Sequence, residues 1–90
     1  MRCISVYTGD YDRFSDLVDD ILRMPPGENE EKLLDGIVIA DSGETDAGYV
    51  DRLMQKPDVA VLKEKGRGIT ILQHGGVFEI FLPDSENVVH

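Results

Sequence analysis

The sequence predicts a small domain of the α/β or α+β class, with the element order β-α-β-α-β-β-β and a mixed sheet that carries two helices. Three observations support this prediction: short runs rich in β-branched residues, two stretches with apolar residues at helical spacing, and glycine-rich turns between the last strands. A chain of 90 residues is enough for one domain. We expect that domain to cover residues 1–83 and to be followed by a polar C-terminal tail over 84–90.

The first strand is predicted over residues 2–7, where Ile4 and Val6 share one face of an alternating pattern. Apolar residues then recur three and four positions apart, which indicates an amphipathic helix. These residues are Phe14, Leu17, Val18, Ile21 and Leu22. Asp10 can cap the start of this helix, and Pro25 ends it because the residue before a proline is pushed out of the α region.

A second strand and helix follow. Residues 28–35 are expected to form a loop that carries one helical turn, and the continuous apolar run over 36–40 predicts a buried strand. The spacing of Asp41 and Glu44 resembles a capping box, so the second helix is expected to begin there and to run to about Gln55. Because helices separate the first three strands, we expect those strands to be parallel.

The rest of the chain predicts an antiparallel meander with strands over 59–62, 69–73 and 77–82. The glycines of residues 74–76 are explained by a hairpin turn. Two helices cannot fully cover both faces of such a sheet. If both helices pack on one face, the other face must be covered by a second copy of the chain, or by residues 28–35 and the tail.

The two strand-to-helix turns are the site-like feature of the sequence. Each combines hydroxyl, glycine and acidic residues, and parallel strands would place both turns at the edge where open α/β sheets bind ligands. The residues are Thr8, Gly9, Asp10, Asp41, Ser42, Gly43 and Glu44. Asp10 and Asp41 would then face each other and suit Mg²⁺ or Ca²⁺. In the alternative interpretation, these side chains cap helices and bind nothing.

The composition limits the partners and the location. The chain has 18 acidic and 9 basic residues, and a net charge of −9 disfavours nucleic acid and anionic membranes as partners. No run approaches the ~18 apolar residues of a membrane span, and the N-terminal apolar stretch is too short for a secretory signal. We therefore expect a cytoplasmic protein. The single cysteine, Cys3, excludes an intrachain disulfide and is expected to be a small buried hydrophobe.

We expect a non-catalytic role as a protein-interaction or regulatory module, acting as a homo-oligomer or a small subunit and needing no cofactor. One alternative is a domain that binds a cation or small ligand through residues 8–10 and 41–44, either as a binding domain alone or as an enzyme. Another is an acidic mimic of nucleic acid, built on the carboxylates of the first helix. Those carboxylates are Asp12, Asp16, Asp19 and Asp20. An exposed apolar face, a pocket between the two turns or a convex acidic surface would distinguish the three.

Overall fold

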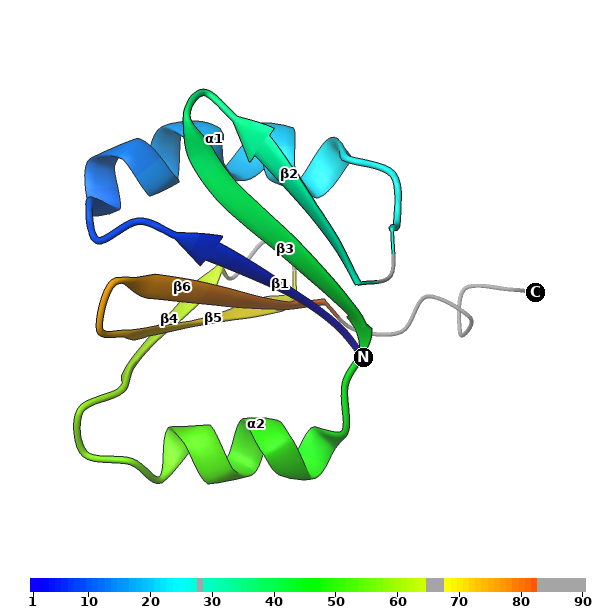
Figure 1. The fold of residues 1–90 in the computed structure, drawn as a ribbon. Coiled ribbons are helices and arrows are strands. Elements are labelled where there is room, and N and C mark those ends of the chain that lie inside the picture. Colours follow the sequence, from blue (N-terminus) through cyan, green and yellow to red (C-terminus); the bar gives the residue numbers. More distant parts are fainter. Residues whose placement is uncertain (28, 65–67, 83–90) are drawn as a thin grey trace.

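The fold is a small α+β domain in which one sheet lies between two helices (Figure 1). The structure is a computed structural model that describes residues 1–27, 29–64 and 68–82, so the predicted tail over 84–90 lies outside the described residues. The elements are β1 (Arg2–Tyr7), α1 (Tyr11–Arg23), β2 (Glu30–Leu34), β3 (Ile37–Glu44), α2 (Ala47–Met54), β4 (Ala60–Glu64), β5 (Ile69–His74) and β6 (Val77–Leu82).

The sheet has six strands in the order β2-β3-β1-β6-β5-β4, and every neighbouring pair is antiparallel. The prediction that the first three strands are parallel neighbours is therefore wrong. The three strands predicted over 2–7, 36–40 and 59–62 correspond to β1, β3 and β4. β3 runs antiparallel to β1, and β4 lies at the far edge of the sheet beside β5. The meander predicted for the C-terminal half is present as β4, β5 and β6.

The hairpin of β2 and β3 accounts for most of this difference. The region predicted as a loop with one helical turn contains β2, and the turn that follows has positive φ at Asp35 (54°) and Gly36 (81°). Two such residues form the tight turn whose twist matches an antiparallel hairpin. A connection of this length joins antiparallel strands only. β3 consequently returns beside β2, and Leu33 pairs with Val38.

β3 also runs further than predicted, to Glu44, so the second helix does not begin at Asp41. α2 begins at Ala47 instead, with Asp46 as its N-cap. A β-bulge allows the long strand to stay paired with β1, since Cys3 pairs with Gly43 but Ile4 pairs with Asp41. Gly43 has a φ of 73°, a conformation that favours glycine at such a bulge.

Each face of the sheet packs against its own helix. The α1 face holds the larger core, which is formed by Ile4, Val6, Phe14, Val18, Ile21, Ile37, Ile39, Ile69, Ile71, Phe78 and Ile80. The α2 face holds a smaller core, which is formed by Cys3, Val50, Leu53, Leu72 and Phe81. Because each face is covered by a helix, neither face needs a second copy of the chain to cover it. Within the described ranges, neither helix is long and apolar enough to cross a membrane.

The apolar stripe predicted for the first helix is confirmed, with one difference in depth. Phe14, Val18 and Ile21 are buried, whereas Leu17 is only partly buried against the same core. Phe14 also stacks on Phe78, with ring centroids 4.2 Å apart and an interplanar angle of 9°. These contacts hold α1 over the centre of the sheet.

Replacing Ile21 by alanine should reduce the free energy of unfolding by about 2–5 kcal/mol, as at other fully buried aliphatic positions. Ile21 is 0% exposed, so the cavity cannot be filled by solvent. Leu17→Ala should cost less, and Asp16→Ala at an exposed helix position serves as the control. Urea unfolding measures all three. An equal or greater loss for Leu17→Ala would contradict the packing described here.

Candidate functional site

The two turns predicted to share a pocket lie at opposite ends of β1. Residues 8–10 follow Tyr7, which pairs with Val38, whereas Asp41 pairs with Ile4 and Glu44 pairs with Arg2. Because β1 and β3 are antiparallel, the C-terminal end of one lies beside the N-terminal end of the other. The predicted metal site between Asp10 and Asp41 is therefore wrong, and so is the shared ligand pocket.

The acids near these turns have separate roles. Asp10 is the N-cap of α1 and accepts hydrogen bonds from the backbone N–H groups of Asp12 and Arg13, so the capping interpretation is confirmed there. Thr8 accepts a hydrogen bond from the backbone of Asp10 at 3.2 Å. Glu44 lies in β3 and pairs with the N-terminal amino group at 2.9 Å, so the capping interpretation does not hold for it.

Asp41 is a buried structural ion. Arg2 donates to its Oδ2 atom from Nη2 at 2.6 Å and from Nε at 3.1 Å. The backbone N–H groups of Gly27 and Gly43 donate to the two carboxylate oxygens at 3.1 and 2.9 Å. Burial alone would raise the pKa of Asp41, but these hydrogen bonds and the Arg2 charge hold it below the ordinary value of 3.8. Asp41 thus ties β1 and the segment after α1 to β3.

A polar cluster that sequence reasoning missed lies on the α2 face. Its centre is Glu79, which is 5% exposed. The carboxylate oxygens of Glu79 lie 3.7 Å from Cys3 Sγ, 3.4 Å from Ser5 Oγ, 3.2 Å from Tyr49 OH and 2.5 Å from His74 Nε2. The signal in the sequence is an acid inside the apolar run of 77–82. The alternation of side chains along the strand over 77–82 predicts which face of the sheet Glu79 lies on. It does not predict which side chains from other elements contact Glu79 there.

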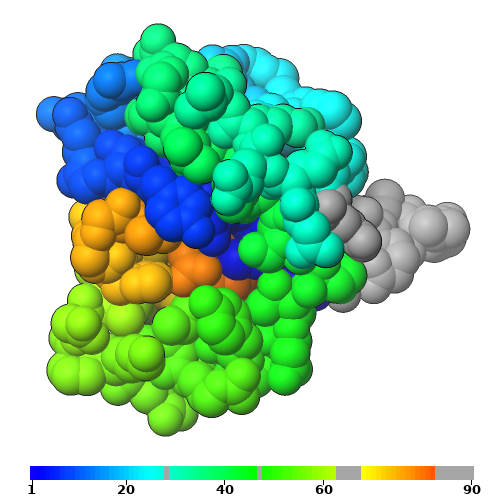
Figure 2. Space-filling model, in the orientation of Figure 1, coloured from blue at the N-terminus to red at the C-terminus, as the bar shows by residue number. Residues whose placement is uncertain are grey.

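The cluster is at the edge of the space between α2 and the sheet. Figure 2 shows the hairpin between β5 and β6 (orange) at the surface between α2 (green) and β1 (blue). The side chain of His74, which begins this hairpin, is 32% exposed, whereas that of Glu79 is 7% exposed. Tyr49 is the member that comes from α2, so its hydroxyl connects the helix to the carboxylate on β6.

The chemistry of the cluster is that of one acceptor surrounded by donors, because an ionised carboxylate only accepts hydrogen bonds. Burial raises the pKa of the Cys3 thiol to about 12, and the neighbouring Glu79 charge adds to the effect. Burial and the same charge also raise the pKa of Tyr49. A thiol that keeps its proton is a poor nucleophile. The arrangement therefore favours a structural network over nucleophilic catalysis by Cys3.

In the part of the chain that the structure describes, no group of three or more His, Cys, Asp or Glu side chains is arranged to hold a metal ion. The Glu79 cluster and the Arg2–Asp41 pair belong to the packing of the sheet. The candidates for a partner-binding site are therefore the exposed surfaces.

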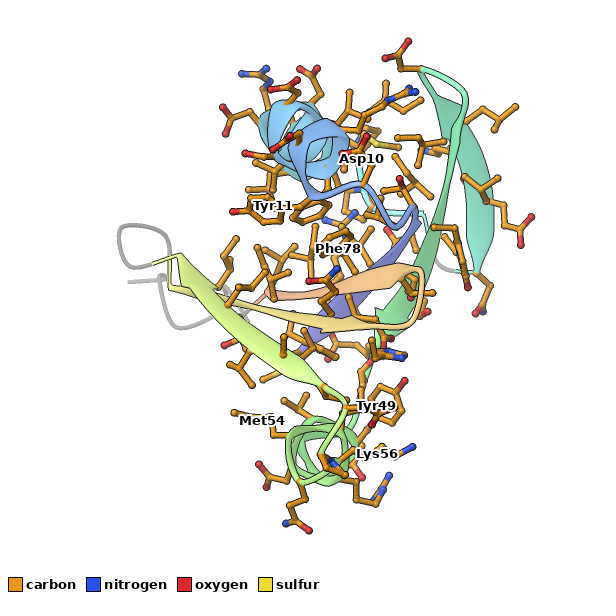
Figure 3. The ribbon with its side chains drawn as sticks, turned by 90° about the vertical axis from the view of Figure 1, so that its left-hand side faces the viewer. Asp10, Tyr11, Tyr49, Met54, Lys56 and Phe78 are labelled. Atoms are coloured by element: carbon orange, nitrogen blue, oxygen red, sulfur yellow. The ribbon has the colours of Figure 1, made fainter. Side chains whose placement is uncertain are left out.

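Within the residues that the structure describes, a groove of about 280 Å³ lies between α1 and the β4–β5 hairpin. We call this the α1–β4 groove; it is lined by Tyr11, Phe14, Ser15, Val18, Val61, Leu62 and Ile71. Figure 3 shows Tyr11 reaching from α1 towards the sheet above Phe78, and the two ring centroids are 6.0 Å apart. Tyr11 lines the groove from α1 and is 51% exposed. Val61 is 39% exposed, but its register partner Leu72 lies in the α2-face core, so strand alternation turns the Val61 side chain away from α1.

A second exposed apolar patch lies on the other face of the sheet. Leu33, Val38 and Tyr7 are cross-strand neighbours on β2, β3 and β1, and all three are exposed, Leu33 to 73%. This patch is a row of side chains on a sheet, whereas the α1–β4 groove has walls from a helix and a hairpin. The groove offers a partner more contact on each side, so we take it as the candidate binding site.

Comparisons with protein-family models, with curated proteins and with solved structures found no match to this chain. The site is therefore interpreted from its own geometry.

Asp41→Asn should reduce the free energy of unfolding at neutral pH by about 1–3 kcal/mol, because Arg2 loses a charged partner in a part-buried position. The folded state holds the pKa of Asp41 below the ordinary 3.8, so the stabilisation is present above that value and is lost as the pH falls through the lowered pKa. The variant should consequently lose less stability than the wild type below pH 3.8. Urea unfolding at several pH values tests this, with Glu31→Gln at an exposed position of β2 as the control. Parallel pH profiles for wild type and Asp41→Asn would contradict the assignment.

A second prediction concerns alkaline pH. The thiol of Cys3 ionises near its ordinary pKa of 9.0 in the unfolded chain and near 12 in the folded one. The folded state therefore retains more protons between these values, so stability should fall as the pH rises. From pH 9 to about pH 11 the wild type should lose about 2–3 kcal/mol more than Cys3→Ala. Chemical unfolding in this range measures the difference. Equal losses in the two proteins would show that Cys3 is accessible to water in the native state.

Proposed function

We propose that this chain is a protein-interaction module that binds a basic, amphipathic segment of another protein in the α1–β4 groove. The observation that carries this proposal is a groove between α1 and the β4–β5 hairpin, beside which α1 exposes acidic side chains. The half-exposed ring of Tyr11 in the groove supports a non-catalytic interaction role, and the partner's charge is inferred from the carboxylates beside it.

The apolar part of the surface supplies the affinity. Tyr11 stands partly in solvent, while Phe14, Val18 and Ile71 form a wall and floor that belong to the buried core. A partner that covers Tyr11 removes apolar area from water, at about 25 cal/mol for each Å². Because the wall is rigidly packed, it needs little reordering when the partner binds.

The acidic part of the surface selects the partner. Ser15 lines the groove, and residues three and four positions away are its neighbours on the helix, which places Asp12 and Asp19 at the groove's rim. Asp16 and Asp20 of α1 are also exposed, and Figure 3 shows acidic side chains pointing outward from this helix. Carboxylates arranged in this way steer a basic partner and disfavour an acidic one.

The two basic residues of α1 both have acidic partners. Arg13 donates to the backbone oxygen of Asp35 and to its carboxylate, which lies 3.2 Å away at the turn between β2 and β3. Arg23 pairs with Asp20 at 2.7 Å in the last turn. A second copy of the chain would carry the same net charge of −9, so a basic partner is favoured over self-association.

Affinity capture from cells of the source organism tests the proposal, with wild type, Ser15→Lys and Leu33→Lys as baits. Ser15 is exposed and lines the groove, so Ser15→Lys places a positive charge there, and Leu33→Lys adds the same charge on the exposed patch of the other sheet face. A captured protein should bind wild type and Leu33→Lys alike, should bind Ser15→Lys at least about tenfold more weakly, and should be released by salt.

The captured protein should then be purified, and its affinity measured directly against the three baits. Equal binding to all three, or loss only with Leu33→Lys, would contradict the groove. A wild-type chain that light scattering shows to be a dimer, and that Ser15→Lys makes monomeric, would identify a second copy as the occupant and contradict the basic partner. Binding that salt abolishes but that Ser15→Lys leaves unchanged would instead support an acidic mimic.

A further inference from the structure

We propose that α2 is a lid that opens away from the sheet while the sheet and α1 stay folded, and that a hydrogen bond between Tyr49 and Glu79 holds it closed. This motion is separate from the binding of a partner in the α1–β4 groove. Three features of the structure support the lid: the unequal packing of the two helices, the local bonding of the backbone around α2, and the polar contact that links this helix to β6.

α2 is held to the sheet by less packing than α1. α1 has 13 residues, and three of them are buried in the larger core. α2 has 8 residues and buries Val50 and Leu53 in the smaller core. A helix of this length is marginal in water without packing, and Gly48 in its first turn lowers its helix propensity further. We therefore expect α2 to leave the sheet at a lower cost than α1.

The backbone around α2 is bonded within its own segment. The side chain of Asp46 accepts a hydrogen bond from the backbone N–H of Gly48 at 3.1 Å and caps the helix. After the helix, the backbone N–H of Lys56 donates to the carbonyl of Leu53 at 3.1 Å. These bonds do not connect the segment to a strand, so they do not oppose its movement away from the sheet.

The lid has a fixed point on either side. Before α2, the backbone N–H of Thr45 donates to the carbonyl of Met1 at 2.6 Å. After it, β4 begins at Ala60, which pairs with Gln73 of β5. Residues 55–58 lie between the helix and β4 and are exposed, and Figure 1 shows this connection looping out beyond the end of α2. An exposed connection of this kind can absorb the change in backbone angles that a hinge requires.

Tyr49 supplies the polar contact between the lid and the sheet. Its hydroxyl lies 3.2 and 3.4 Å from the two carboxylate oxygens of Glu79, to which it donates. Glu79 is 5% exposed, so removal of a donor leaves a buried charge with fewer partners. In the open state water solvates the carboxylate instead. Loss of the Tyr49 hydroxyl therefore costs the closed state more than the open state, and it shifts the equilibrium towards opening.

α2 covers apolar side chains that opening would expose. Cys3, Leu72 and Phe81 are buried in one cluster with Val50 and Leu53 of the helix. Because side chains of a strand alternate between its faces, this cluster lies on the same face as the exposed apolar patch of β1, β2 and β3. An open lid would therefore enlarge that patch and bring the thiol of Cys3 into water.

The thiol of Cys3 reports the opening, because a buried thiol is inert towards a disulfide reagent until it is exposed. The rate at which dithiobis-nitrobenzoate labels Cys3 is measured at several urea concentrations below the unfolding transition. Hydrogen exchange, followed by mass spectrometry, reports on the amides of α2, α1 and β6 in the same solutions. The variants are Tyr49→Phe and, as the matched control, Tyr11→Phe, which removes the same hydroxyl from a half-exposed ring on α1. Urea unfolding of each protein gives its global stability.

In the wild type, the labelling rate should depend on urea less than about half as strongly as global unfolding does, because opening a lid exposes less surface. The detached helix is marginal in water, so the amides of α2 should exchange with the same opening constant, within about threefold. The amides of α1 and β6 should exchange only with global unfolding. Tyr49→Phe should raise both the labelling rate and the exchange of α2 at least about fivefold, and Tyr11→Phe should change them by less than about twofold.

Other results overturn the inference. Labelling of Cys3, or exchange of α2, with the full urea dependence of global unfolding would exclude a lid. Exchange of α1 at the same rate as α2 would exclude it too, because the two helices would then open together. Fast labelling while the amides of α2 stay protected would show that the reagent reaches Cys3 by another route. Equal rates for wild type and Tyr49→Phe, or equal increases in Tyr49→Phe and Tyr11→Phe, would exclude the hydrogen bond to Glu79 as the contact that holds the lid closed.

Discussion

The tight turn at Asp35 and Gly36 is the constraint on which the arrangement of the sheet depends. Both residues have positive φ, and this conformation reverses the chain within two residues. The reversal places β3 antiparallel between β2 and β1, and it carries residues 41–44 to the end of β1 that is remote from Asp10. With the opposite direction of β3, the two acidic segments would meet at one edge. The direction of a single strand thus decides whether the chain has an acidic pocket or two separate structural acids.

The two faces of the sheet are built on different principles. The α1 face is a continuous apolar core, in which stacked aromatic rings and aliphatic side chains hold a long amphipathic helix. The α2 face has a smaller apolar core and a buried carboxylate, Glu79, whose four donors come from β1, α2 and β5. A buried charge is tolerated only when its hydrogen bonds are satisfied, so these donors are a condition of the fold. Tyr49 gives the short helix α2 a directional attachment that apolar packing alone does not provide.

The functional hypothesis follows from the way α1 covers only part of its face of the sheet. α1 protects the centre of its face and leaves the β4 side open, and the same helix carries carboxylates on its outer surface. Apolar walls and a charged rim are the general anatomy of a protein interface, in which the apolar centre supplies affinity and the rim supplies orientation and rate.

The sequence by itself determined the local elements whose patterns are strong. The helical spacing of Phe14, Val18 and Ile21 defined α1, Pro25 marked its end, and the glycines of 74–76 marked the last hairpin. The Asp35–Gly36 pair between apolar residues is also a hairpin signal, although the expected loop over 28–35 ignored it. Local patterns of this kind report backbone preferences, which neighbouring residues in the chain decide.

Only the tertiary structure decided which strands are neighbours, which helix covers which face and which side chains surround Glu79. Strand order depends on contacts between residues far apart in the chain, and a local pattern of alternation is the same for parallel and antiparallel neighbours. The bulge at Gly43 is a further example, because Asp41 pairs with Ile4 of the α1-face core whereas Gly43, two residues later, pairs with Cys3 of the α2-face core. The partners of Asp41 and Glu79 come from distant segments of the chain. The α1–β4 groove is also lined by distant segments, because Tyr11 belongs to α1 and Val61 belongs to β4.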